Sequence, residues 1–195
     1  MSALNISDYK KIIRERMGDY RFSHSVNVAK EAKKLAKHYG ADENKAEIAG
    51  ILHDITKEMP KEQQLQIIID SGIILDNVQL HAPKLWHGMS GSIVVRDELG
   101  IDDEDILNAI RYHTIGKKNM GLVSKIVYIA DAIEDKRNWP GVEHARELAA
   151  EDLDEAIIYE IDMKMKYLIT RRALIHPNTL ELRNDLIHKD MNEKI

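Results

Sequence analysis

The chain has 195 residues, a length that suits one domain able to bury a core without disulfides. It contains no cysteine, which excludes thiol catalysis and thiolate metal sites, so any metal must be bound by nitrogen and oxygen ligands. The net charge of -5, without an extended basic run, gives no electrostatic footprint for nucleic-acid binding. No stretch approaches the roughly 18 apolar residues of a membrane span, and no secretory signal opens the chain. We expect a cytoplasmic protein with no nucleic-acid or membrane partner.

Apolar residues recur at helical spacing along almost the whole chain. After a first helix within residues 1–20, the pattern predicts helices over about 22–39, 42–54, 61–71, 84–98, 103–113, 122–135, 142–149, 153–172 and 179–190. Gly40 and Gly100 are expected to end two of these helices, whereas Asp42 and Asp102 or Asp103 are expected to begin others as N-caps. Thr179 is expected to cap the last helix.

The sequence predicts an all-α fold, a single-domain helical bundle. A β-branched run at residues 125–130 resembles a strand, but no partner strand with turn chemistry lies nearby. There is no internal repeat and no linker rich in proline, glycine or serine. We expect residues 1–20 to be an N-terminal helix of the same domain, residues 21–140 to form its core, and residues 141–195 to form helices packed on that core.

Several titratable side chains lie on faces that should be buried. His24 shares the apolar stripe of its helix, His113 completes another stripe, and Asp131 is flanked by apolar residues. A buried imidazole or carboxylate is costly without a partner. Each such histidine, taken singly, is more often a hydrogen-bonded structural residue. Together they indicate a bound metal ion, and iron, manganese, zinc and nickel all accept imidazole and carboxylate ligands.

The order of these residues resembles a known signature. His24, then His53-Asp54, then Asp131 is similar to the H…HD…D pattern of HD-domain phosphohydrolases, and His87 and His113 resemble its binuclear version. More narrowly, the chain resembles the YqeK family of symmetrical bis(5'-nucleosyl)-tetraphosphatases through the segments RFSHSVNVA, GILHDITKEMP, LWHGMSG and YHTIGKKNMGLVSKIVYIADAIEDKR. The resemblance extends over about residues 21–184 and shows no departure at the six ligand positions.

The resemblance implies a binuclear metal site in an HD core. One ion would be held by His24, His53, Asp54 and Asp131, and Asp54 would bridge to a second ion that is also bound by His87 and His113. The implied metal is two iron ions, with manganese or another divalent transition metal as the alternative. A metal-activated hydroxide would cleave diadenosine tetraphosphate into two nucleoside diphosphates.

Neighbouring polar residues are candidates for catalysis and substrate binding. Asp54 and Lys57 are the candidate catalytic residues, and the candidate substrate-binding residues are Lys57, Thr114, Lys125 and Arg137. Lys57 follows His53 by one helical turn and should share its face. The plainer alternative for each cation is a solvated surface charge. Glu134 and Asp135 are expected to face solvent, with support of a metal ligand as the alternative.

Three other functions are compatible with the sequence. They are hydrolysis of a mono-, tri- or cyclic nucleotide by the same metal chemistry, nucleotide sensing without turnover, and a helical interaction protein with structural histidines. The segment from His176 to Thr179, together with Asn184, also resembles the family, but a helix stop and restart explains it without substrate contact. The apolar stripe of residues 157–168 is core packing, and an exposed part of it could form a homodimer interface.

Overall fold

Helices are the only regular secondary structure over residues 5–193, the part of the chain that the computed structural model describes. This confirms the predicted fold class. None of the helices in this range is long and apolar enough to cross a membrane. The helices are α1 (Ile6–Arg14), α2 (Asp19–Tyr39), α3 (Glu43–Leu52), α4 (Lys61–Asp70), α5 (Asn77–His81), a 3-10 turn (Pro83–Leu85), α6 (Trp86–Leu99), α7 (Glu104–Tyr112), α8 (Leu122–Ile133), α9 (Val142–Glu151), α10 (Leu153–Thr170) and α11 (Pro177–Glu193).

Local capping sets most of these boundaries. Asp42 and Asp103 accept hydrogen bonds from backbone N–H groups in the first turns of α3 and α7, which satisfies donors that have no partner within the helix. Gly40 and Gly100 adopt left-handed conformations, with φ of 69° and 67°, at the ends of α2 and α6. The predicted boundaries at these positions are confirmed.

Two local features differ from the prediction. The short helix α5 was not expected, because five residues carry too little periodicity, although a capping box between Asp76 and Gln79 starts it. The last helix begins at Pro177, so Thr179 lies inside it and does not cap it. The Thr179 hydroxyl instead donates to the carbonyl oxygen of Ile115, 3.0 Å away, and so attaches α11 to the segment after α7.

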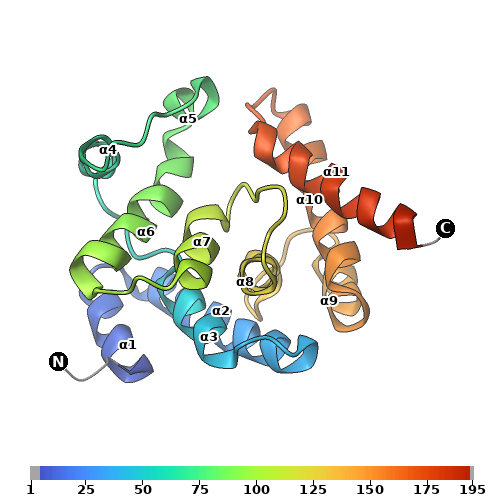
Figure 1. The fold of residues 1–195 in the computed structure, drawn as a ribbon, viewed down its shortest axis with the longest axis horizontal. Coiled ribbons are helices and arrows are strands. Elements are labelled where there is room, and N and C mark those ends of the chain that lie inside the picture. The colour runs from blue at the N-terminus through green and yellow to red at the C-terminus, as the bar shows by residue number, and fades with distance from the viewer. Residues whose placement is uncertain (1–4, 194–195) are drawn as a thin grey trace.

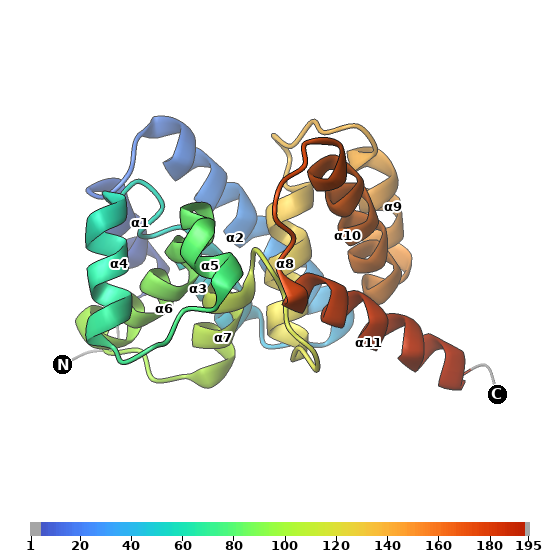
Figure 2. The same cartoon turned by 90° about the horizontal axis from the view of Figure 1, so that it is seen from above.

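Helix α8 occupies the middle of the molecule. In Figure 1, α4 to α7 lie on one side of it and α9 to α11 on the other, and Figure 2 shows the same division after a 90° turn. Aliphatic side chains and alanines from α2, α3, α7 and α8 form most of the core, and α1 adds Tyr9 and Ile13 to it. A charged residue on α8, or at the end of a helix that packs on it, can therefore lie in the interior of the protein.

Two glycines allow close approach between the helices that carry the predicted ligands. A Cβ atom on Gly50 of α3 would lie 2.8 Å from the Cα atom of Ala29 on α2. A Cβ atom on Gly88 of α6 would lie 2.8 Å from the carbonyl oxygen of Arg111 on α7. Both contacts are with backbone, which cannot give way as the end of a side chain can. The spacing of α2 from α3, and of α6 from the end of α7, therefore depends on glycine.

We expect Gly50→Ala to destabilise the protein by about 1–3 kcal/mol, the usual cost of overpacking a core. Denaturant unfolding measures this loss. Gly91→Ala is the matched control, because its Cβ would meet only side-chain atoms, at 3.4 Å or more. Alanine favours a helix by about 1 kcal/mol over glycine, so the control should be neutral or stabilising. Equal stability of the two variants would contradict the close-packing role of Gly50.

Candidate metal centre

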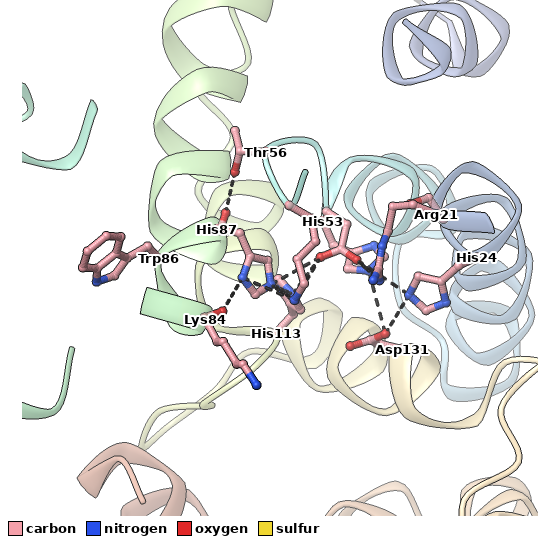
Figure 3. Close-up of polar contacts among 12 residues, drawn as sticks. Arg21, His24, His53, Thr56, Lys84, Trp86, His87, His113 and Asp131 are labelled. Atoms are coloured by element: carbon pink, nitrogen blue, oxygen red, sulfur yellow. Dashed lines mark hydrogen bonds and ion pairs between the residues drawn. The ribbon is translucent and has the colours of Figure 1, made fainter. Parts of the chain in front are cut away.

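The six predicted ligands lie near the ends of five helices. Figure 3 shows the four histidines and Asp131 facing a common point. His24 is in the second turn of α2, His87 is in the first turn of α6, and Asp131 is in the last turn of α8. His53 and His113 follow the last residues of α3 and α7, and Asp54 comes directly after His53. The structure thus brings all six predicted ligands together, although they span more than half of the chain.

Three of the four histidine rings are each oriented by a hydrogen bond to a nearby backbone carbonyl oxygen. The ring Nδ1 atoms of His53, His87 and His113 lie 2.7, 2.8 and 2.7 Å from the carbonyl oxygens of Gly50, Lys84 and Ile110. Each carbonyl belongs to the residue three positions earlier in the chain. The carbonyls at a helix C-terminus lack partners within the helix, so His53 and His113 satisfy two of them. Because each Nδ1 donates its proton in this way, each Nε2 presents a lone pair to the site.

His24 is oriented by a carboxylate instead of a carbonyl. Its Nδ1 lies 3.1 Å from Oε1 of Glu134, whose Oε2 accepts hydrogen bonds from Asn27 and from the backbone N–H of Lys136. Glu134 is buried, so the expectation that it faces solvent is wrong, whereas Asp135 is exposed as expected. Glu134 therefore supports a ligand, which was the alternative reading of the sequence.

We expect Glu134→Ala to lower metal affinity by roughly 10- to 100-fold, the usual cost of removing the outer partner of a metal-binding histidine. Without the carboxylate, the His24 ring loses its fixed tautomer and orientation. Titration of the metal-free protein with Mn²⁺ measures the change. Asp135→Ala, at the exposed neighbouring position, should leave the affinity unaltered, and an equal loss in both variants would refute the role of Glu134.

The two carboxylate oxygens of Asp54 face different pairs of histidines. Oδ2 lies 3.4 Å from Nε2 of His53 and 3.9 Å from Nε2 of His24. Oδ1 lies 3.3 Å from Nε2 of His87 and 3.7 Å from Nε2 of His113. Asp54 thus stands between two histidine pairs and offers one oxygen to each.

Asp131 completes the group on the His24 side. Its Oδ1 lies 3.0 Å from Nε2 of His24 and 3.8 Å from Nε2 of His53. Two sets of three ligand atoms are close enough to hold an ion: His24, His53 and Asp131 form one, and His53, Asp54 and His113 form the other. His53 belongs to both sets, so it lies between them.

The donor set fits divalent transition metals. Nε2 of His53 and Oδ1 of Asp54 are buried and have no hydrogen-bond partner among residues 5–193. Such groups are rare in native proteins, because each costs free energy unless something satisfies it. A cation would satisfy both atoms. Imidazole nitrogen and carboxylate oxygen without thiolate suit iron, manganese, zinc or nickel.

Most of the ligands are in the protonation state that a metal requires. Burial would raise the pKa of Asp54, but its electrostatic interactions with His53 and His87 hold it well below its usual range. Burial likewise would raise the pKa of Asp131, but its interactions with His24, His53 and Arg137 hold it well below its usual range. Burial lowers the pKa of His87 and of His113. At neutral pH both carboxylates are therefore ionised and these two imidazoles are neutral.

Three cationic side chains surround the carboxylates. Nη1 of Arg21 lies 2.6 Å from Oδ2 of Asp54, and Nη2 of Arg137 lies 2.5 Å from Oδ1 of Asp131. Nζ of Lys57 lies 3.9 Å from Oδ1 of Asp54. Lys57 and Arg137 were predicted from the sequence, but Arg21 was missed. Its position three residues before His24, on the same helical face, was the available signal.

A cavity of about 640 Å³ opens beside the carboxylates, between α8 and α10. His113 and Asp131 contribute to its lining, and so do the predicted substrate residues Thr114 and Arg137. Lys125 is not among the lining residues, because its Nζ pairs with Asp154 at 2.6 and 2.7 Å. Contact between Lys125 and a substrate in this cavity would require that pair to open.

His176 lies away from the ligand cluster. Its Nδ1 accepts a hydrogen bond from the backbone N–H of Asn178, and its Nε2 lies 2.8 Å from Oδ2 of Asp76. It therefore joins the start of α11 to the start of α5. This contact agrees with a structural role for the segment, and a structural role is the plainer reading of the sequence.

Comparison with known proteins defines the class. A family model described as the HD domain matches residues 21–135, so the fold, the ligand order and this match together define an HD-domain protein. The symmetrical bis(5'-nucleosyl)-tetraphosphatase of Bacillus subtilis (strain 168) is 40% identical over 187 residues, which cover 94% of this chain and 98% of that protein. The protein of the same name from Staphylococcus aureus (strain NCTC 8325 / PS 47) is 34% identical over 96% of this chain and 97% of its own length. The chain belongs to the family of these proteins, which confirms the resemblance seen in the sequence.

A solved structure has the same fold. The crystal structure of a Clostridium acetobutylicum protein, described as a predicted HD superfamily hydrolase involved in NAD metabolism, superposes with a TM-score of 0.93 at 38% sequence identity. The match covers 96% of this chain and 100% of the other. The arrangement of α1 to α11 is thus shared over the full length of that relative.

Proposed function

We propose that this protein is a metal-dependent phosphohydrolase that cleaves dinucleoside tetraphosphates symmetrically into two nucleoside diphosphates. The observation that carries the proposal is the position of Asp54, whose two oxygens face two histidine pairs. Relatives that match nearly the whole chain bear the name of this activity. A site with two adjacent cations suits the cleavage of a phosphoanhydride, in which negative charge develops on both the attacking and the leaving oxygen.

We assign His24, His53, Asp54 and Asp131 to one ion, and Asp54, His87 and His113 to the other, with iron as the expected metal. When bound, the two ions would lower the pKa of water and stabilise charge on the phosphoryl oxygens. The protein's own contribution is to fix the ligands. Three backbone carbonyls and Glu134 hold the four imidazole rings before any substrate arrives.

The surrounding cations would orient the polyphosphate. Arg21, Lys57 and Arg137 lie around the ligand cluster, where they can neutralise the phosphates next to the scissile bond. One water molecule adds to an inner phosphorus, and the central P–O bond breaks. The departing nucleoside diphosphate takes the bridging oxygen, so diadenosine tetraphosphate gives two molecules of ADP.

We expect Lys57→Ala to reduce kcat/KM by about 10- to 100-fold without loss of metal, the scale of a hydrogen bond to a charged group. Its Nζ lies 3.0 Å from Nε2 of His87, close to the ligands, and 71% of the side chain is buried, so it can meet a phosphate without binding the ion itself. Steady-state kinetics and elemental analysis of one preparation separate the two effects. Lys34→Ala, at a side chain that is 74% exposed, is the control. Loss of metal from Lys57→Ala would contradict this role.

The proposed function is tested by metal content and turnover measured together. About two transition-metal equivalents per chain, with chelator-sensitive release of ADP from diadenosine tetraphosphate, would support it. A panel of mono-, tri- and cyclic nucleotides runs alongside. Preference for any of these over the dinucleotide would overturn the substrate assignment. Absence of both metal and activity, even after iron or manganese is restored, would overturn the proposal as a whole.

A further inference from the structure

Two chemically different groups of residues line the cavity beside the ligand cluster. His113, Asp131 and Arg137 belong to the ligand cluster or contact it. Tyr128 of α8, with Glu160 and Lys164 of α10, forms the second group. The volume of about 640 Å³ lies within the roughly 300–1,000 Å³ of small-molecule sites. A ligand bound at the cluster can therefore extend into this cavity.

Other residues that line the cavity are apolar or aromatic, and together they suit a flat, partly apolar group. They include Ala132, Trp139, Pro140, Met163 and Tyr167. The chain has only two tryptophans and one phenylalanine, yet one of the tryptophans and a tyrosine both line this cavity. Trp139 is fixed by a hydrogen bond of 2.7 Å from its Nε1 to the carbonyl oxygen of Ala132. Aromatic rings that line a cavity beside the ligand cluster are suited to contact with a nucleobase.

Tyr128, Glu160 and Lys164 are joined to one another by hydrogen bonds. Nζ of Lys164 lies 2.9 Å from the Tyr128 hydroxyl, 2.9 Å from Oε1 of Glu160 and 3.4 Å from the carbonyl oxygen of Thr114. The Tyr128 hydroxyl donates to Oε2 of Glu160 over 2.9 Å. An ammonium group has three hydrogens, so the three oxygens around Lys164 occupy all of its donors.

The charges of this network balance internally. Burial would lower the pKa of Lys164, but Glu160 and Tyr128 raise it above its usual value, so the ammonium remains charged. Each oxygen of Glu160 receives one hydrogen bond and keeps acceptor capacity. The opposite charges of Glu160 and Lys164 offset each other, so this part of the cavity offers hydrogen-bond acceptors that suit neutral N–H or O–H groups.

We propose that this cavity holds one nucleoside of the substrate and that Glu160, held in place by Tyr128 and Lys164, is a specificity-determining residue that accepts hydrogen bonds from it. The inference rests on the proposed function and adds to it the orientation of the bound substrate. The phosphates lie at the ligand cluster, and the nucleoside points toward α10. The donors on a nucleoside are the ribose hydroxyls and the exocyclic amine of the base, and either can reach an acceptor of this kind.

Glu160→Gln tests the proposal, because it keeps the shape of the side chain and removes its charge. In the metal-loaded protein we expect KM for diadenosine tetraphosphate to rise by about 10- to 100-fold, with a much smaller change in kcat. Glu47→Gln is the matched control: Glu47 is also a largely buried carboxylate, with 18% side-chain exposure, and pairs with Lys33 at 2.6 Å outside this cavity. An unchanged KM in Glu160→Gln would overturn the proposal and leave the network as a helix-packing contact.

Two substrate analogues separate the possible donors. Diinosine tetraphosphate replaces the exocyclic amine, and the bis(2'-deoxyadenosine) tetraphosphate lacks the 2'-hydroxyl. The wild-type protein should discriminate against the analogue that lacks the recognised donor, and Glu160→Gln should lose that discrimination. Equal discrimination by the two proteins against both analogues would count against contact between Glu160 and the nucleoside.

A second pair of variants tests the nucleoside site independently, in case Glu160→Gln does not fold. Tyr167 lines the cavity and is 57% exposed, so its truncation should leave the fold intact, while Ile169 on the same helix is 61% exposed and does not line the cavity. Tyr167→Ala should weaken ADP binding to the metal-loaded protein in calorimetry, and Ile169→Ala should not. Equal ADP affinity in the two variants would refute the cavity as the nucleoside site.

The same calorimetry distinguishes failure of the inference from failure of the proposed function. If the wild-type protein hydrolyses diadenosine tetraphosphate but Glu160→Gln and Tyr167→Ala behave like it, the inference alone is wrong. If the wild-type protein does not hydrolyse this substrate, the proposed function is wrong. ADP binding that weakens in both variants would then still support a nucleoside site.

Discussion

We expect Asp54→Asn to abolish turnover, with a loss well beyond the roughly 100-fold cost of losing an outer partner of a ligand. The substitution keeps the size of the side chain but removes the charge that lies between the two histidine pairs. An amide offers one oxygen where the carboxylate offers two, so it cannot serve both sides of the site. Hydrolysis of diadenosine tetraphosphate and metal content measure the effect, while circular dichroism should report unchanged helicity.

Glu98→Gln is the control for Asp54→Asn. It also removes a carboxylate from an ion pair with an arginine, here Arg16 at 2.7 Å, but on an exposed part of the surface. Its activity should match that of the wild type, because surface ion pairs contribute little. Near-normal turnover by Asp54→Asn with its metal retained would contradict the bridging role of Asp54.

The second large effect concerns stability. We expect a divalent metal at about 100 times its dissociation constant to stabilise the folded protein by about 2.7 kcal/mol, because it binds the folded chain and not the unfolded one. For a domain of this size the gain corresponds to a rise in Tm of about 5–10 °C. Thermal unfolding with and without Mn²⁺ measures it. Asp54→Asn should show a smaller rise, and an equal rise in both proteins would place the metal elsewhere.

This stabilisation should decrease as the pH falls. Ligation requires neutral imidazoles and ionised carboxylates, so protons compete with the metal. The pKa values of Asp54, Asp131, His87 and His113 are lowered. These four side chains therefore keep the protonation state that binds metal when the pH falls below neutral. His53 is the exception, because the charges of Asp54 and Asp131 raise its pKa despite its burial. It takes up a proton first as the pH is lowered from the alkaline side.

The metal-induced rise in Tm should therefore be constant at alkaline pH and should shrink on the acid side of the His53 titration. A series of thermal unfolding measurements at fixed total metal, from alkaline to acidic pH, follows this change. A rise that stays constant into acid would show that the metal does not compete with protons for these histidines.

The sequence by itself determined the helices and the ligand order. Periodicity placed α2, α3, α7 and α8 within a few residues, because each has a regular pattern of buried apolar residues and three of the four carry a cap that the sequence reveals. It also placed His24 and His113 on buried faces, and the order of the six ligands indicated the family. These features are local, or are carried by residue order, so they can be read without knowing how the helices pack.

The tertiary structure decided the features that depend on chain reversals and on contacts between distant helices. Glu134 lies beyond the last residue of α8 with an extended backbone, φ of -52° and ψ of 157°, so helical periodicity could not place it. The position of Asp54 between two histidine pairs requires α2, α3, α6 and α7 to converge, which Gly50 and Gly88 allow by close backbone contact. Glu160 and Lys164 meet Tyr128 across the α8–α10 interface, and no spacing in the sequence predicts a contact between residues of different helices.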